Sequence, residues 1–152
     1  MKSDFTFFHS IKVRWSEVDM QKVVFNGNYF NYLDVAVYES WQAMVAAGIQ
    51  AAGPALQTRF TEWIHNIYVV KATADYHAPA RWNDVLDIGV RVARLGRSSM
   101  RTVTEIYCGG EHLVSGELIY VYKDPVADAS APLPDEFRGL IIGFEKTRPE
   151  GA

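Results

Sequence analysis

Asp19 is the acidic residue whose surroundings in the sequence best fit a reaction centre. A short apolar turn that carries a glycine, residues 23–28, follows it, and the longest helical pattern of the chain begins directly afterwards. A carboxylate in this position can act as a nucleophile or as a general base. The first N–H groups of a helix have no acceptor within the helix, so they can stabilise negative charge. The stretch Val18–Trp41 therefore predicts a reaction centre.

The helix that positions this centre is expected from Asn28 to Ala47. Asn26 or Asn28 fits its N-cap, and Gly48 stands where a C-terminal glycine is common. Apolar residues occupy most of its circumference, which is typical of a helix covered on several sides. We infer that a curved sheet wraps around it.

Alternating apolar and polar residues predict the strands of that sheet. The expected strands are Phe8–Trp15, Trp63–Tyr76, Leu86–Val92, Met100–Cys108 and Leu113–Tyr122. Gly109–Gly110 predicts a two-residue hairpin turn, and Gly116 predicts a bulge or a close approach to another backbone. One helix on one face of an antiparallel sheet is an α+β layout.

The segments outside this pattern are expected to be less regular. Residues 48–60, with two glycines and a proline, predict a connecting loop with at most a helical turn. After a polar linker, Pro134 followed by two acids predicts a short C-terminal helix. The last seven residues, 146–152, are expected to be a loose tail. We expect a single domain over 1–152, with a core at about 5–123 and an extension at 124–152.

Composition narrows the class of protein. The 152 residues have a net charge of −3 and contain no Lys/Arg run, which disfavours a nucleic-acid partner. No segment resembles a signal sequence or a membrane span, so we expect a cytoplasmic protein with no membrane partner. The single cysteine, Cys108, excludes an internal disulfide and is expected to be a buried small apolar residue. The four histidines, His9, His65, His77 and His112, are scattered, and no metal site is expected. His65 is expected on a strand, packed or hydrogen-bonded.

Three segments together resemble the hotdog-fold acyl-CoA thioesterases of the 4-hydroxybenzoyl-CoA thioesterase type. They are VRWSEVDMQKVVFNGNYFNYLD (13–34), ADYHAPARWNDVLDI (74–88) and RLGRSSMRTVTEIY (94–107). The resemblance covers roughly residues 5–123. It implies a hotdog fold, in which a five-stranded antiparallel sheet wraps a long central helix, followed here by the short C-terminal helix. It also implies hydrolysis of an acyl-CoA thioester without a cofactor, by a homodimer or homotetramer whose active sites are built from two chains.

The resemblance also assigns roles to residues. Asp19 matches the catalytic carboxylate, and Asn26 matches the position whose backbone N–H receives the thioester oxygen. Asn28 and Tyr29 match the Asn-Tyr pair that opens the helix, and Gly27 permits a close backbone approach. These four residues, 26 to 29, are the expected substrate-binding set. One departure is Lys22, where the family usually has glycine; it alters the loop between the acid and the helix and could change substrate choice.

The turn Gly96–Ser99 is the expected coenzyme A contact. Arg97, Ser98 and Ser99 could meet the phosphates or the pantetheine, because arginine matches phosphate geometry. The alternative is ordinary turn chemistry. A set of aromatic residues could line an acyl pocket, or form the core and a subunit interface: Trp15, Tyr29, Tyr32, Trp63 and Tyr68.

Alternatives to the leading assignment remain at this point. Glu39 on the helix is the second candidate for the catalytic acid, and Glu17 is expected to be a surface charge. A non-catalytic acyl-CoA-binding domain is an alternative function. A hotdog hydratase or dehydratase is a further one; it would use a histidine near the helix start, and no histidine lies between Ile11 and Ile64.

Overall fold

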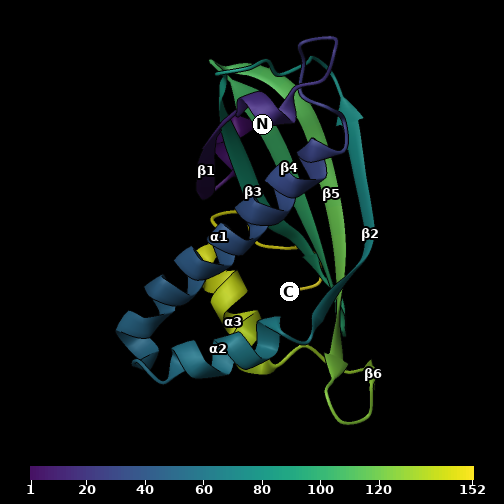
Figure 1. Ribbon diagram of the computed structural model, residues 1–152. Coiled ribbons are helices and arrows are strands. Elements are labelled where there is room, and N and C mark those ends of the chain that lie inside the picture. Colours follow the sequence, from purple (N-terminus) through teal and green to yellow (C-terminus); the bar gives the residue numbers. More distant parts are fainter.

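A curved antiparallel sheet encloses one long helix in the computed structural model, which describes residues 1–152 (Figure 1). Five strands lie in the order β1-β3-β4-β5-β2, and every neighbouring pair is antiparallel. The strands are β1 (Phe7–Lys12), β2 (Ile67–Tyr76), β3 (Val85–Leu95), β4 (Ser99–Cys108) and β5 (Glu111–Asp124). A two-residue strand, β6 (Ala129–Ser130), pairs with the end of β5. The expected α+β architecture is confirmed.

The long helix α1 (Asn28–Ala52) spans 25 residues, or roughly 37 Å. Its buried side is fully enclosed, with Leu33, Ala36 and Val37 at no more than 1% exposure, packed into one core with strand residues such as Ile88 and Ile106. Burial of this continuous apolar surface holds the helix against the sheet.

The end of α1 was predicted five residues too early. Gly48 lies inside the helix, where a Cβ atom would meet the side chains of Leu140 and Leu56. The residue that ends the helix is Gly53, whose φ of +85° lies in the left-handed region that glycine adopts at low cost. Gly48 is therefore a packing residue, and not a helix cap.

A second helix was missed in the segment expected to be a loop. Helix α2 (Leu56–Ile64) buries Leu56 and Phe60, and β2 begins only at Ile67. The prediction of a strand from Trp63, with His65 on it, was therefore wrong: His65 is an exposed residue that caps α2. Two short 3-10 helices, η1 (Lys2–Asp4) and η2 (Trp15–Glu17), complete the N-terminal region, and η2 replaces the expected end of the first strand.

The predicted C-terminal helix is confirmed as α3 (Asp135–Phe144), with Pro134 at its N-cap and Phe137 buried. The prediction of a loose tail was wrong. Glu150 pairs with β3, since its carbonyl accepts from the N–H of Leu95 and its N–H donates to the carbonyl of Ala93. The tail thus adds a short segment beside the end of β3.

The predicted Gly109–Gly110 turn is confirmed, whereas the prediction of a bulge or a close backbone approach at Gly116 was wrong, because the strand register is regular there and the neighbouring atoms belong to side chains. Gly109 and Gly110 both have positive φ, +56° and +88°, as a tight turn of this kind requires. At Gly116 a Cβ atom would meet Thr104 on β4 and Leu33 on α1, so the glycine permits the helix to approach the sheet. None of the helices combines the length and the apolar character needed to cross a membrane.

Candidate active site

Asp19 lies at the tip of a small hairpin that precedes α1. Its N–H donates to the carbonyl of Val23, and its own carbonyl accepts from the N–H of Lys22, both at 2.9 Å. The carboxylate atom Oδ1 accepts from the N–H of Gln21 at 2.8 Å, while Oδ2 accepts no hydrogen bond and no basic side chain pairs with the acid. The half-buried carboxylate is thus fixed by one oxygen and free at the other.

Lys22 occupies a left-handed backbone position in this hairpin. Its φ is +62°, a region that glycine populates freely and other residues enter at a cost of about 1 kcal/mol. This conformation explains why a glycine is expected at the position. The exposed lysine side chain meets no steric obstacle from the core at this position.

The start of α1 offers two free backbone donors. The N–H groups of Asn26 and Gly27 donate to no acceptor in the chain, and both residues are exposed. The N–H of Asn28, in contrast, donates to the carbonyl of Phe25 at 2.9 Å. Of the helix-start residues expected to contact substrate through the backbone, only Asn26 and Gly27 therefore have an N–H available.

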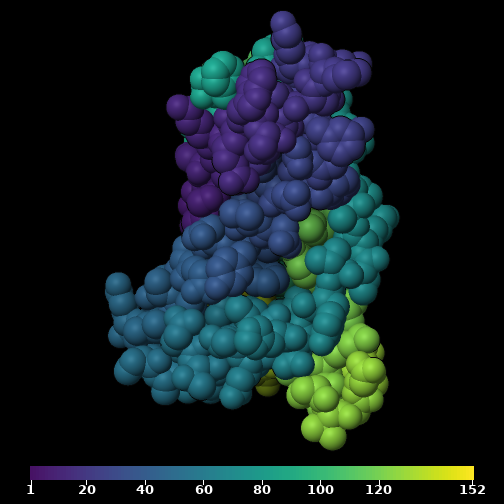
Figure 2. Space-filling model, viewed as in Figure 1, coloured from purple at the N-terminus to yellow at the C-terminus, as the bar shows by residue number.

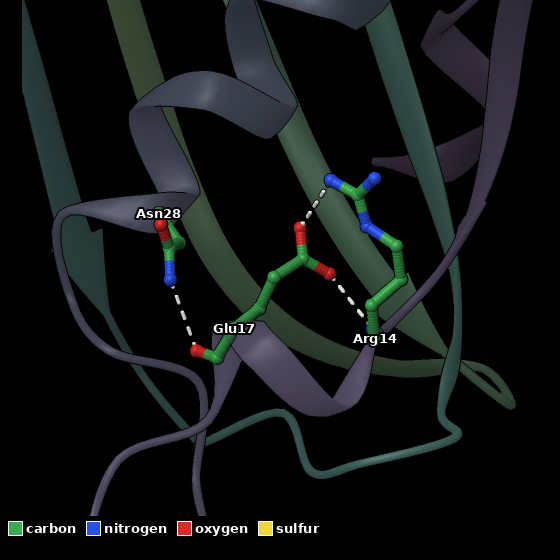
Figure 3. Close-up of polar contacts among 3 residues, drawn as sticks. All are labelled: Arg14, Glu17 and Asn28. Atoms are coloured by element: carbon green, nitrogen blue, oxygen red, sulfur yellow. Dashed lines mark hydrogen bonds and ion pairs between the residues drawn. The ribbon is translucent and has the colours of Figure 1, made fainter.

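Glu17 was predicted to be a surface charge, and this prediction was wrong. The residue is only 8% exposed, and its carboxylate accepts from the N–H of Arg14 at 2.7 Å and from its guanidinium at 3.0 Å (Figure 3). Burial alone would raise the pKa of Glu17, but the hydrogen bonds from Arg14 outweigh it, so the pKa lies below its ordinary value. The carbonyl of Glu17 accepts from the amide of Asn28 at 3.0 Å and from the N–H of Phe25 at 2.9 Å. Glu17 therefore anchors the segment that leads into the helix.

A cavity of about 270 Å³ opens beside the helix start. The Tyr76 hydroxyl donates to the carbonyl of Asn26 at 3.1 Å, and the Tyr29 hydroxyl accepts from the N–H of Ala80 at 3.0 Å. The lining residues are Val24, Asn26, Tyr29, Tyr76, His77, Ala78 and Pro79. Two of the expected substrate-binding residues, Asn26 and Tyr29, thus meet in one cavity, whereas Asp19 does not line it within the single chain.

His77 is a cavity residue that the sequence analysis did not single out. It follows the end of β2, yet it lies at the start of α1 in space. The histidines are also not all scattered, because the rings of His77 and His112 lie 4.8 Å apart between centroids. The sequence shows only that His77 follows a predicted strand. It does not show that the end of this strand lies beside the start of α1.

The expected coenzyme A contact lies at the other end of the sheet. Arg97, Ser98 and Ser99 belong to the hairpin after β3, whereas the hairpin of Asp19 pairs through Val23 with Arg81, just before β3 begins. Strand β3 between them is roughly 35 Å long, and it runs the length of the sheet (Figure 1). Arg97 is exposed and forms no ion pair. Within one chain, the structure does not bring the hairpin and the acid together.

The remaining candidates are dispersed. Glu39 lies on α1 about 16 Å from the helix start, and it lines a separate, mostly apolar cavity between α1 and β2, where the surface is hollowed (Figure 2). Among the aromatic set, Trp15 packs on Trp82 at the surface, and Trp63 stacks on Phe137. Only Tyr29 of that set lines the cavity at the helix start.

Comparison with known proteins identifies the family. The model of the thioesterase superfamily matches residues 21–115, more than half of the chain. A thioesterase from Thermus thermophilus, solved with coenzyme A and zinc, is 24% identical, with a TM-score of 0.77 over 95% of this chain and 97% of that one. A 1,4-dihydroxy-2-naphthoyl-CoA thioesterase from Synechocystis is 21% identical, with a TM-score of 0.69 over 89% and 94%. At these identities the two structures show a shared fold. No curated protein sequence matches the chain significantly. The family match confirms the expected class of enzyme, and the chain belongs to the thioesterase superfamily.

Proposed function

We propose that the protein hydrolyses an acyl-CoA thioester to the free acid and coenzyme A, with Asp19 as the catalytic carboxylate. The observation that carries this proposal is the helix start, where Asn26 and Gly27 are exposed residues whose N–H groups donate to no acceptor. Asn26 also lines a cavity of about 270 Å³, and a carboxylate with one free oxygen precedes both residues on the hairpin. These are the parts that acyl transfer from a thioester needs.

The two free N–H groups would receive the negative charge that develops on the thioester oxygen. Each such donor is worth roughly 3 kcal/mol of transition-state stabilisation, and the positive end of the helix dipole adds to it. Asp19 would either attack the carbonyl carbon to form an anhydride or take a proton from the attacking water. In both routes its free oxygen, Oδ2, is the reacting atom.

A second copy of the chain would complete the site. Strand β2 is an edge strand with exposed apolar side chains, including Tyr68, Val69 and Val70. Its start lies beside the β3–β4 hairpin, because Ile67 pairs with Tyr122 and the N–H of Tyr122 donates to the carbonyl of Ser98. The end of β2 lies at the helix start, where Tyr76 bonds to Asn26.

Antiparallel pairing of β2 with β2 of another copy would therefore place the hairpin of one chain near the helix start of the other. Arg97 could then contact the phosphates of a coenzyme A whose thioester lies at the partner's catalytic acid. This arrangement supports a homodimer, or a homotetramer of two such dimers, as the working form.

Asp19→Asn is the test of the catalytic assignment. Asparagine can keep the hydrogen bond from the N–H of Gln21 to Oδ1, so we expect unchanged thermal unfolding and a loss of at least about 10³-fold in kcat for acyl-CoA hydrolysis. The matched control is Asp135→Asn, which changes an exposed acid in the first turn of α3 and should leave kcat unchanged. A folded Asp19→Asn enzyme with near wild-type turnover would sink the assignment.

Thiol release from a panel of short, long and aromatic acyl-CoA esters identifies the acyl group. Release from none of them, with coenzyme A binding intact, would favour the non-catalytic acyl-CoA-binding alternative. A hotdog hydratase would use a histidine near the helix start, and His77, which follows β2, supplies one there although no histidine lies close to the helix start in the sequence. Hydration of an enoyl-CoA ester therefore belongs in the same panel.

A further inference from the structure

A chain of three polar side chains leads from the cavity at the helix start across the end of the sheet. Nε2 of His77 lies 2.9 Å from Oγ of Ser115 on β5. The same hydroxyl lies 3.2 Å from Nε2 of His112, which is also 3.0 Å from the carbonyl oxygen of Val114. His77 is exposed and lines the cavity that holds Asn26, whereas His112 and Ser115 are half-buried.

The hydrogen atoms in this chain follow from the chemistry of its members. A carbonyl oxygen can only accept, so Nε2 of His112 carries a proton and donates to Val114. The Ser115 hydroxyl has one proton and two lone pairs. It can donate to Nε2 of His77 or, after rotating, accept from a protonated Nε2. The hydrogen bond between Nε2 of His77 and Ser115 therefore forms whether or not Nε2 carries a proton. Nδ1 of His77 can then gain or lose a proton without breaking this bond.

The surroundings hold this chain in place. The ring of Tyr107 stacks on His112 at 5.0 Å between centroids, and the Tyr107 hydroxyl donates to Glu105. Burial, and then the bond to Glu105, raises the pKa of Tyr107 above its ordinary value, so this tyrosine stays neutral. Tyr76, the neighbour of His77, uses its hydroxyl on the carbonyl of Asn26. Within this group the two imidazoles are the side chains whose ring nitrogens can both donate and accept a proton.

We infer that His77 is a second catalytic residue, which donates the proton on Nδ1 to the sulfur of coenzyme A as the thioester C–S bond breaks, and that Ser115 and His112 position its ring. This inference rests on the proposed thioester hydrolysis and assigns its leaving-group step. The juxtaposition that carries it is the cavity that His77 and Asn26 both line, together with an Asn26 N–H that donates to no acceptor.

The proton balance of the step closes without another reactant. In the general-base route Asp19 takes one proton from water, the water oxygen bonds to the carbonyl carbon, and the C–S bond breaks with its electron pair on sulfur. Protonated His77 supplies the Nδ1 proton that converts the thiolate to the thiol, and Ser115 accepts from the proton that stays on Nε2 of neutral His77. The starting state returns when Asp19 releases its proton to solvent water and Nδ1 of His77 takes one up. In the anhydride route the same proton goes to sulfur when Asp19 attacks, and His77 regains a proton from the water that opens the anhydride.

The test compares leaving groups. We expect His77→Gln to lower kcat for an acyl-CoA ester by roughly 10²-fold, and to leave hydrolysis of the same acyl group on thiophenol close to wild type. Thiophenolate is a much weaker base than the coenzyme A thiolate and leaves without protonation. Ser115→Ala should show the same pattern at a smaller size, and imidazole in the buffer should restore His77→Ala. The control His9→Gln, on β1, should behave as wild type.

Three results would overturn the inference. Equal losses for the coenzyme A and thiophenyl esters would make His77 a binding residue, and no loss for either would remove it from the site. Hydration of an enoyl-CoA ester that depends on His77, with thiol release unaffected, would also contradict the leaving-group role. Failure of the proposed function is distinguishable, because Asp19→Asn must abolish hydrolysis of both esters whether or not His77 takes part.

Discussion

Replacing Glu145 with glutamine is expected to stabilise the protein above neutral pH. Glu145 ends α3 and is only 8% exposed. Its Oε1 accepts from the N–H of Val92 on β3 at 2.8 Å, and its buried Oε2 has no partner. Burial raises the pKa of this carboxyl from 4.5 to about 7, although the bond from Val92 and the charge of Arg91 act in the opposite direction.

The magnitude follows from the two pKa values. A folded-state pKa about 2.5 above the ordinary one corresponds to about 3 kcal/mol, at about 1.4 kcal/mol for each pKa unit. Because the pKa of Glu145 is raised in the folded protein, its contribution to the free energy of unfolding is fully favourable below pH 4.5. This contribution is lost as the pH rises through about 7. Glutamine keeps an acceptor for Val92 and carries no charge. We therefore expect Glu145→Gln to gain about 3 kcal/mol at pH 8 and about 1 kcal/mol at pH 5.

Urea unfolding at the two pH values, at equal protein concentration, measures this difference. Glu150→Gln is the matched control, because Glu150 lies in the same terminal segment with an exposed side chain, and its bonds to β3 use only the backbone. An equal gain of Glu145→Gln at both pH values, or a loss of stability at pH 8, would contradict a carboxyl pKa that is raised by burial.

Two further changes test backbone and packing constraints by thermal or urea unfolding. Lys22→Gly should raise the free energy of unfolding by up to about 1 kcal/mol, because φ is +62° there. The neighbouring control Gln21→Gly should lower it. A less stable Lys22→Gly protein would contradict the strain assigned to that turn. Gly116→Ala should destabilise by about 1–3 kcal/mol, because the added Cβ meets Thr104 and the fully buried Leu33. Gly139→Ala, on α3 with open space around it, should instead gain about 0.5–1 kcal/mol, and equal effects of the two alanines would refute the packing argument.

The parts of the fold that depend on neighbouring residues could be predicted from the sequence. The period-two pattern located the strands, and Gly109–Gly110 marked a turn that requires two positive φ values. The end of α1 could not be read in this way, because Gly48 and Gly53 are both plausible caps and only the position of Leu140, far along the chain, distinguishes them. Helix α2 could not be predicted for a similar reason. Its nine residues are held in a helix by the burial of Leu56 and Phe60 against residues that are distant in the sequence.

In the candidate site, too, contacts between residues near in sequence could be predicted and contacts between distant residues could not. Asp19 and the helix start are close in sequence, so their proximity was predictable, and their chemical roles stay predictions until tested. The burial of Glu17 and the meeting of His77 with His112 depend on elements that only the folded chain brings together. A carboxylate two residues from Asp19 looks like surface charge until Arg14 is known to cover it.

The position of Glu17 also explains how the helix start can be rigid and still have unused donors. A group that stabilises an oxyanion must be held in place before the reaction, yet its N–H must not already be bonded. Here the segment is held by other groups: Asn28 bonds through its side chain to the carbonyl of Glu17 and through its N–H to Phe25, while Tyr76 holds the carbonyl of Asn26. Every one of these contacts avoids the N–H groups of Asn26 and Gly27. Glu17 therefore supports the site by fixing the loop, and the half-buried Asp19 two residues later keeps one carboxylate oxygen free to react.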